Sequence, residues 1–287
     1  MKIALASIFI EGEYYKDIID CGFIMLLYFR GCTARERLNS IAESTEAILN
    51  AADIEYETLD DEKCCGSVLL RTGFRDDAIH EMKLNARDLE GKTIVTSCAG
   101  CYKTLKEDYK ELIGCELDVI HISQLLDQLI EDGRLKTNEN DLKVTYHDPC
   151  HLGRHAGEFE APRKVISSIS DFIEMENIRN KSRCCGSGGG VKSAYGDLSN
   201  SIAKLRIREA EDTGADLLVS ACPFCKLNLG ENSDDLEVLD LSEFVLDNLV
   251  LDSDDVDGDK ESVGVTSDKE SVEGVNSDKE FFKEAGL

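Results

Sequence analysis

Residues 93–101 read TIVTSCAGC, and residues 216–225 read DLLVSACPFC. In both stretches a short apolar run ends at the first cysteine of a Cys-x-x-Cys pair. Such runs predict buried strands at 94–96 and 217–219. Because open α/β sheets bind ligands beyond the carboxyl ends of their strands, we expect these cysteines at a ligand-binding edge.

The cysteines around these two stretches form a duplicated pattern. Ten of the 12 cysteines fall into two groups with the same order, namely a single cysteine, a Cys-Cys-Gly and a Cys-x-x-Cys. The first group is Cys32, Cys64, Cys65, Cys98 and Cys101, and the second is Cys150, Cys184, Cys185, Cys222 and Cys225. Residues 117–126 also resemble residues 236–245. This internal repeat predicts two related halves, residues 22–133 and 142–250.

Strand and helix patterns alternate within each half. Further buried strands are predicted at 23–29 and 144–146. Apolar residues at helical spacing predict one buried helix face over 41–49 and another over 122–130. The alternation indicates an α/β fold in which two homologous βα-repeat, Rossmann-like halves each contain a parallel sheet. Ser123 and Ser242 stand where the N-cap of the last helix of each half is expected.

Charge and hydropathy exclude several classes of protein. The 287 residues include 58 acidic and 32 basic side chains, a formal net charge of −26. Such a chain lacks the basic patches that neutralise nucleic-acid phosphates or anionic membranes. Its apolar runs are too short to cross a bilayer, and its apolar start lacks the cleavage site of a secretory signal. We therefore expect a cytoplasmic protein without direct membrane insertion.

The segment 251–287 has a different composition. It is polar, and the tripeptide Asp-Lys-Glu occurs in it three times. Few apolar side chains are available to offset the entropy of ordering, so the segment is predicted to be a disordered acidic tail. A docking role is the alternative.

The grouped thiols indicate a metal site. Cytoplasmic proteins use cysteines for metals or redox chemistry more often than for disulfides. Structural zinc takes four ligands, usually from two Cys-x-x-Cys pairs, whereas each half offers five cysteines with one adjacent pair. Five thiolates suit a polynuclear centre, and iron–sulfur clusters are the common centres of that kind. Zinc remains the alternative at this point.

The motifs resemble those of a known family. Residues 28–32 read YFRGC, residues 64–73 read CCGSVLLRTG and residues 146–154 read YHDPCHLGR. In their duplicated order they are similar to the CCG-domain, or cysteine-rich domain, proteins. Within that family they most resemble the B-type polypeptide of heterodisulfide reductase and the C-terminal part of its D-type polypeptide. The likeness covers residues 25–250, and related proteins often have proline where Arg30 stands.

The resemblance implies a cofactor, an activity and partners. In this family each group of five cysteines holds a [4Fe-4S] cluster of non-cubane type, so both groups given above would hold one. The disulfide of coenzyme M and coenzyme B is cleaved between the clusters by two one-electron steps. Subunits with flavin and ferredoxin-type iron–sulfur clusters would donate the electrons. The alternative is an electron-transfer subunit of a flavin-dependent hydroxyacid- or succinate-type oxidoreductase, but two complete groups favour disulfide cleavage.

The resemblance also implies cationic substrate contacts. Coenzymes M and B carry sulfonate, phosphate and carboxylate groups, which bind arginine, lysine or histidine. His151 and Arg154 follow Cys150, and Arg35 and Arg71 occupy comparable places in the first half. These four are the candidate substrate-binding residues, with packing or surface roles as the alternative.

The glycines after the adjacent cysteines are candidates for backbone contacts with a metal cluster. Gly66 and Gly186 follow Cys65 and Cys185. A backbone without side chains can approach a metal cluster closely and offer it N–H groups. An ordinary turn is the alternative.

Overall fold

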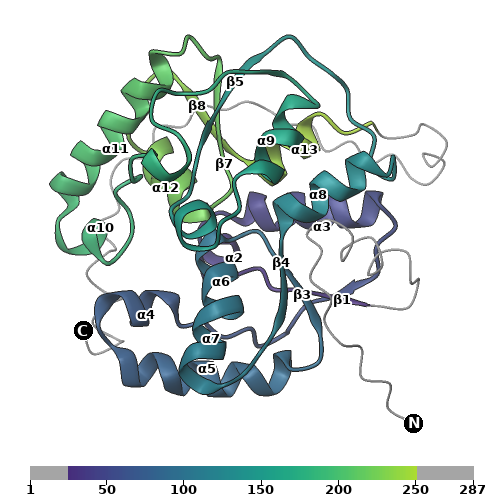
Figure 1. Ribbon diagram of the computed structural model, residues 1–287, viewed down its shortest axis with the longest axis vertical. Helices are drawn as coiled ribbons and strands as arrows, with labels where there is room; N and C mark the ends of the chain where they lie inside the picture. The colour runs from purple at the N-terminus through teal and green to yellow at the C-terminus, as the bar shows by residue number, and fades with distance from the viewer. Residues whose placement is uncertain (1–24, 251–287) are drawn as a thin grey trace, which may run out of the picture. The chain divides into compact units, whose positions relative to one another are not determined.

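The computed structural model describes residues 25–250 of the chain (Figure 1). The predictions for the start of the chain and for the tail 251–287 therefore concern residues outside the described part. Within 25–250 the chain forms two four-stranded sheets, and every strand pairing in them is parallel. The predicted α/β class with a parallel sheet in each half is confirmed.

The first half carries the sheet in the lower part of Figure 1. Its elements are β1 (Leu26–Tyr28), α2 (Cys32–Glu36), α3 (Asn39–Ala51), β2 (Tyr56–Glu57), α4 (Ser67–Thr72), α5 (Arg75–Leu89), β3 (Thr93–Thr96), α6 (Ala99–Lys103), the π-helix η1 (Thr104–Asp108), α7 (Tyr109–Ile113), β4 (Asp118–His121) and α8 (Ile122–Glu131). The strand order is β2-β1-β3-β4. All of β1 and β3 is buried, which agrees with their apolar sequences.

The second half repeats this plan. Its elements are β5 (Lys143–His147), the π-helix η2 (His151–His155), α9 (Glu160–Ser167), β6 (Asp171–Phe172), the 3₁₀ turn η3 (Arg179–Lys181), α10 (Val191–Ala194), α11 (Gly196–Glu211), β7 (Leu217–Ser220), α12 (Pro223–Gly230), β8 (Glu237–Asp240) and α13 (Leu241–Asp247). The strand order, β6-β5-β7-β8, matches that of the first sheet. The limits 22–133 and 142–250 for the two halves stay a prediction.

The two sheets share one hydrophobic core. Helix α3 packs against α13, and α8 packs against α9 (Figure 1). A helix near the start of each half therefore packs against the last helix of the other half. The hydroxyl of Thr45 on α3 donates to that of Ser242 on α13 at 3.1 Å. The helix faces predicted over 41–49 and 122–130 provide this packing, with Ile41, Ile48 and Leu126 fully buried. The two halves therefore pack directly against each other.

The predicted N-caps of α8 and α13 are wrong by two residues. The caps are His121 and Asp240, whose side chains accept from the backbone N–H of Ser123 at 3.2 Å and of Ser242 at 3.0 Å. Each strand runs directly into its helix, so the last strand residue is also the cap. The serines lie in the first helical turn and are completely buried.

Candidate functional site

The chain turns from strand to helix at a cysteine in four places. Cys98 is the N-cap of α6, and Cys222 is the N-cap of α12, where Pro223 begins the helix. Cys32 begins α2 after β1, and Cys150 precedes η2 after β5. These four cysteines lie at the carboxyl edges of the sheets, as their position after the apolar runs predicted.

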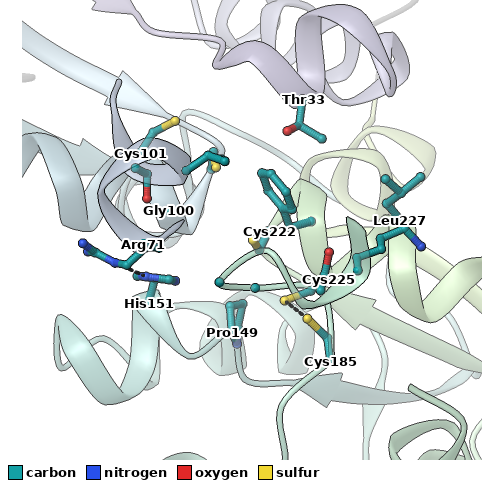
Figure 2. Close-up of a pocket in the computed structure, with 18 of the residues that line it drawn as sticks. Thr33, Arg71, Gly100, Cys101, Pro149, His151, Cys185, Cys222, Cys225 and Leu227 are labelled. Carbon is teal, nitrogen blue, oxygen red and sulfur yellow. Dashed lines mark hydrogen bonds between the residues drawn. The ribbon is translucent and has the colours of Figure 1, made fainter. Parts of the chain in front are cut away.

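All ten cysteines of the two motif groups line one cavity. It is formed by both halves and is lined by Cys32, Cys64, Cys65, Cys98 and Cys101 together with Cys150, Cys184, Cys185, Cys222 and Cys225. Figure 2 shows Cys101 of the first group and Cys222 of the second on elements that face each other. The remaining described cysteine, Cys115, is a buried free thiol outside the cavity.

The two groups repeat the same local contacts. Cys101 Sγ lies 3.4 Å from Cys65 Sγ. In the second group Cys225 Sγ lies 3.3 Å from Cys185 Sγ, as Figure 2 shows. In both halves the glycine after the adjacent cysteines donates its N–H to the first of them, from Gly66 to Cys64 at 3.4 Å and from Gly186 to Cys184 at 3.3 Å. The duplication seen in the sequence therefore extends to contacts between individual atoms.

The crowding of the thiols determines their protonation. Hydrogen bonds from Cys101 and Cys64 lower the pKa of Cys65 to about 6. Hydrogen bonds from Cys150 and Cys185 lower the pKa of Cys184 to about 2. Hydrogen bonds from Cys225 and Cys98 also lower the pKa of Cys222, so the first group stabilises one thiolate and the second group two. Removing the remaining protons would bring several negative charges together, which requires a cationic partner.

The residues fit an iron–sulfur group. Each group of five offers only soft sulfur donors, which is the ligand chemistry of such clusters. Gly31, at φ +80°, brings the backbone so close to the first group that a Cβ there would lie 3.1 Å from Cys101 Sγ. A four-ligand zinc site would leave one thiol of each group unused.

Two of the four candidate substrate-binding residues line the cavity. Arg71 and His151 both do, and Arg71 Nε donates to His151 Nε2 at 3.3 Å (Figure 2). Asp108 accepts from Arg71 Nη2 at 2.7 Å and so fixes the guanidinium. Burial lowers the pKa of His151 to about 4.

The other two candidates are not among the lining residues. Arg35 Nη1 donates to the carbonyl of Glu62 at 2.6 Å, and Arg154 Nη1 donates to the carbonyl of Ser182 at 2.5 Å. These hydrogen bonds therefore hold in place the loops that carry Cys64 and Cys184. Their assignment as substrate contacts stays a prediction, with no support from their position.

The sequence did not indicate two cationic residues that line the cavity. Arg37 and Lys192 line the cavity, and Lys192 Nζ donates to Asn228 Oδ1 at 2.7 Å. Neither belongs to a cysteine motif. Lys192 lies on α10, two residues after Gly188-Gly189-Gly190 of the loop that carries Cys184, and this position is the one signal that could have indicated it.

Fold and site together define an α/β protein whose two parallel sheets share one cysteine-lined cavity. The family profile described as "Cysteine-rich domain" matches residues 26–106 and 144–230. The chain belongs to this cysteine-rich domain, or CCG, family.

Known relatives extend the comparison. The D-type polypeptide of dihydromethanophenazine:CoB–CoM heterodisulfide reductase from Methanosarcina acetivorans is 44% identical over 79% of this chain and 59% of its own length. The B-type polypeptide of fumarate reductase (CoM/CoB) from Methanothermobacter marburgensis is 37% identical over 76% of this chain and 45% of its own length. An uncharacterised iron–sulfur protein of Methanocaldococcus jannaschii is 35% identical over 73% of this chain and 42% of its own length. The chain thus spans about half the length of these relatives, and their names, with the cysteine-rich domain, support iron–sulfur clusters as its cofactor.

The helices of residues 25–250 include none that is both long and apolar enough to span a membrane.

Proposed function

We propose that this chain is the catalytic subunit of a heterodisulfide reductase of the CoM-S-S-CoB type. The observation that carries the proposal is that both complete cysteine groups line a single cavity between the halves. An electron relay needs its centres within transfer distance of each other but needs no shared cavity between them. A disulfide placed in this cavity would meet one group on each side.

The two cysteine groups would hold two [4Fe-4S] clusters of non-cubane type, one per half. When bound, such clusters supply single electrons and iron sites with affinity for sulfur. The protein's own part would be to hold ten sulfurs at helix starts and in two loops, and to exclude water from most of them. Cys65, Cys98 and Cys101 are each at most 4% exposed, and Cys185, Cys222 and Cys225 at most 5%.

The charges around the cavity favour an anionic substrate. Arg37, Arg71 and Lys192 line it, while no aspartate or glutamate within residues 25–250 does. This absence is pronounced in a chain with a net charge of −26. Arg71 and Lys192 are paired with Asp108 and Glu231, which do not line the cavity, so the lining itself presents cationic groups that suit the acidic groups of CoM-S-S-CoB. Val68 and Leu227 supply apolar contacts for its hydrocarbon segments.

The proposal is tested by substrate cleavage. The anaerobically loaded full chain should oxidise a reduced viologen dye in the presence of CoM-S-S-CoB and release both thiols. Arg71→Gln should raise KM by about 10- to 100-fold, because a hydrogen bond to a charged group contributes about 1.5–3 kcal/mol. Lys110→Gln, at an exposed lysine on α7, is the matched control and should leave KM unchanged. A fully loaded chain without heterodisulfide cleavage would contradict the proposal.

The second candidate function is electron transfer within a flavin-dependent hydroxyacid- or succinate-type oxidoreductase. The relative named for a fumarate reductase (CoM/CoB) favours it. In that case the loaded chain should exchange electrons with a flavin-containing partner and should cleave no disulfide. For either function, electron-donating flavin or ferredoxin-type subunits are the proposed partners.

A further inference from the structure

The second half contains a buried pair of side chains that the sequence motifs did not indicate. Arg206 on α11 donates through Nε to Nδ1 of His147, the last residue of β5, at 3.1 Å. Both side chains are completely buried. Arg206 Nη1 also donates to the carbonyl of Asn177 at 2.9 Å and to Glu209 Oε2 at 2.6 Å, which fixes the guanidinium, while its Nη2 has no partner within the described part of the chain.

This contact selects one tautomer of the imidazole. A guanidinium can only donate, so Nδ1 of His147 must be the accepting nitrogen. In the neutral ring the proton then lies on Nε2. Nε2 is buried and has no hydrogen-bond partner within the described part of the chain. A buried N–H without an acceptor is costly, which points to an acceptor that arrives with the bound group.

The thiols of the second group are the candidates for that acceptor. A ring nitrogen of His147 and the sulfurs of Cys185 and Cys225 all lie within 4.8 Å of one another. Because Nδ1 is occupied by Arg206, Nε2 is the nitrogen left for these sulfurs. Direct ligation of a metal by Nε2 would need its lone pair and would place the proton on Nδ1. Two N–H donors, from Arg206 and from the ring, would then face each other.

The first half, as far as the structure describes it, has no such pair. Phe29 and His147 both stand three residues before the single cysteine of their group, and Phe29 is buried in the first half as His147 is in the second. Helices α5 and α11 also correspond, since Gly66 faces Ala78 and Gly186 faces Ser199.

Seven residues after Ala78 and Ser199, respectively, stand Asn85 and Arg206. Both are buried, but Asn85 donates to the carbonyl of Cys64 at 2.7 Å rather than to a ring. The first half therefore replaces both members of the pair, with Phe29 for His147 and Asn85 for Arg206.

We propose that His147, oriented by Arg206, is a positioning residue that donates Nε2–H to the thiolate of Cys185 or Cys225 and so makes the two metal sites unequal. This inference rests on the proposed function in that it places an iron–sulfur cluster on each cysteine group. Hydrogen bonds to ligating sulfurs withdraw negative charge and raise the reduction potential. The cluster of the second half is then the more easily reduced, and the order of the two electron transfers is built into the fold.

The test is a redox titration of the loaded full chain followed by electron paramagnetic resonance. His147→Phe introduces the residue that the first half already accommodates at this place. It should lower the midpoint potential of one cluster signal and leave the other unchanged. His147→Gln keeps an N–H donor and should retain most of the wild-type potential. The signal lost in Cys184→Ser identifies the second-half cluster, which must be the one that shifts.

Two outcomes would overturn the inference. One is unchanged iron content and unchanged potentials in His147→Phe. The other is a strong hyperfine coupling to ¹⁵N-labelled histidine in the wild type, which would show direct ligation. Failure of the proposed function looks different, because a chain that is loaded but cleaves no disulfide still shows the potential shift. If no cluster forms at all, ¹⁵N NMR of the cluster-free chain still tests the Nε2–H tautomer, and an Nδ1–H signal would contradict the inference.

Discussion

In one of the two cysteine loops a glycine stands where any larger residue would overlap with the backbone of a neighbouring helix. Gly186 has φ +88°, and a Cβ on it would lie 2.6 Å from the backbone oxygen of Ser199. Its equivalent Gly66 has φ +89°, but the nearest atoms to its Cβ position lie at 3.4 Å. The second loop is therefore packed more tightly against its helix than the first.

We expect Gly186→Ala to lower the free energy of unfolding by about 2–4 kcal/mol, because it adds both backbone strain and overlap with a backbone atom. Urea denaturation of the full chain under reducing conditions measures this. Gly188→Ala is the matched control in the same loop, since its Cβ would meet no atom within 4 Å. Equal stability of the two variants would show that the close approach of Gly186 to Ser199 is absent.

At this scale the sequence predicts types of residue better than their individual roles. The ten motif cysteines meet in one cavity, and the sequence places four of them, Cys32, Cys98, Cys150 and Cys222, at the ends of strands. Arg35 and Arg71 were both candidate substrate contacts in the sequence, but only Arg71, on the short helix α4, lines the cavity. The direction of a side chain depends on how its helix lies against its neighbours, which spacing along the chain does not specify.

Among the helices and strands, β4 and α8 join at a residue that is both strand end and helix cap. His121 caps α8 through Nδ1, and Gln124 accepts from the backbone N–H of His121 at 3.1 Å. Burial lowers the pKa of His121 to about 4. Its ordinary pKa in an unfolded chain is about 6.5. Between these values the unfolded state binds more protons, so the folded state loses stability as the pH falls.

We expect His121→Asn to reduce this loss, because asparagine is a good N-cap and does not titrate. Between pH 7 and pH 5 the wild-type chain should lose about 2 kcal/mol of unfolding free energy that the variant keeps. Urea denaturation of the cluster-free chain at the two pH values measures the difference. His80→Asn, at an exposed histidine on α5, is the matched control. An identical loss in wild type and His121→Asn would refute the buried, neutral cap.

The elements themselves were predictable where they are long or apolar. The strands predicted from apolar runs appear as β1, β3, β5 and β7, which are the inner strands of the two sheets. The edge strands β2 and β6 are two residues long, Tyr56–Glu57 and Asp171–Phe172, and carry no apolar run. They form because a neighbouring strand offers hydrogen bonds, which is a tertiary effect.

For the molecule as a whole, the two halves are expected to unfold together. Their buried side chains form one continuous core, and α3, α8, α9 and α13 bury their apolar faces across the boundary. We predict a single urea transition that coincides in far-UV circular dichroism and tyrosine fluorescence. Two separate transitions would mean that each half is stable alone. The sequence showed the repeat, but not which faces join the halves, because α3 and α8 would look the same if packed within one half.

The central claim is that the ten cysteines form two complete iron–sulfur sites on a shared cavity. Its most direct test is the amount of iron and acid-labile sulfide in the anaerobically purified full chain, with Cys65→Ser and Cys185→Ser for comparison. We predict about eight irons and about eight sulfides per chain, with a loss of iron in each variant. About four irons, or zinc without sulfide, would contradict the claim.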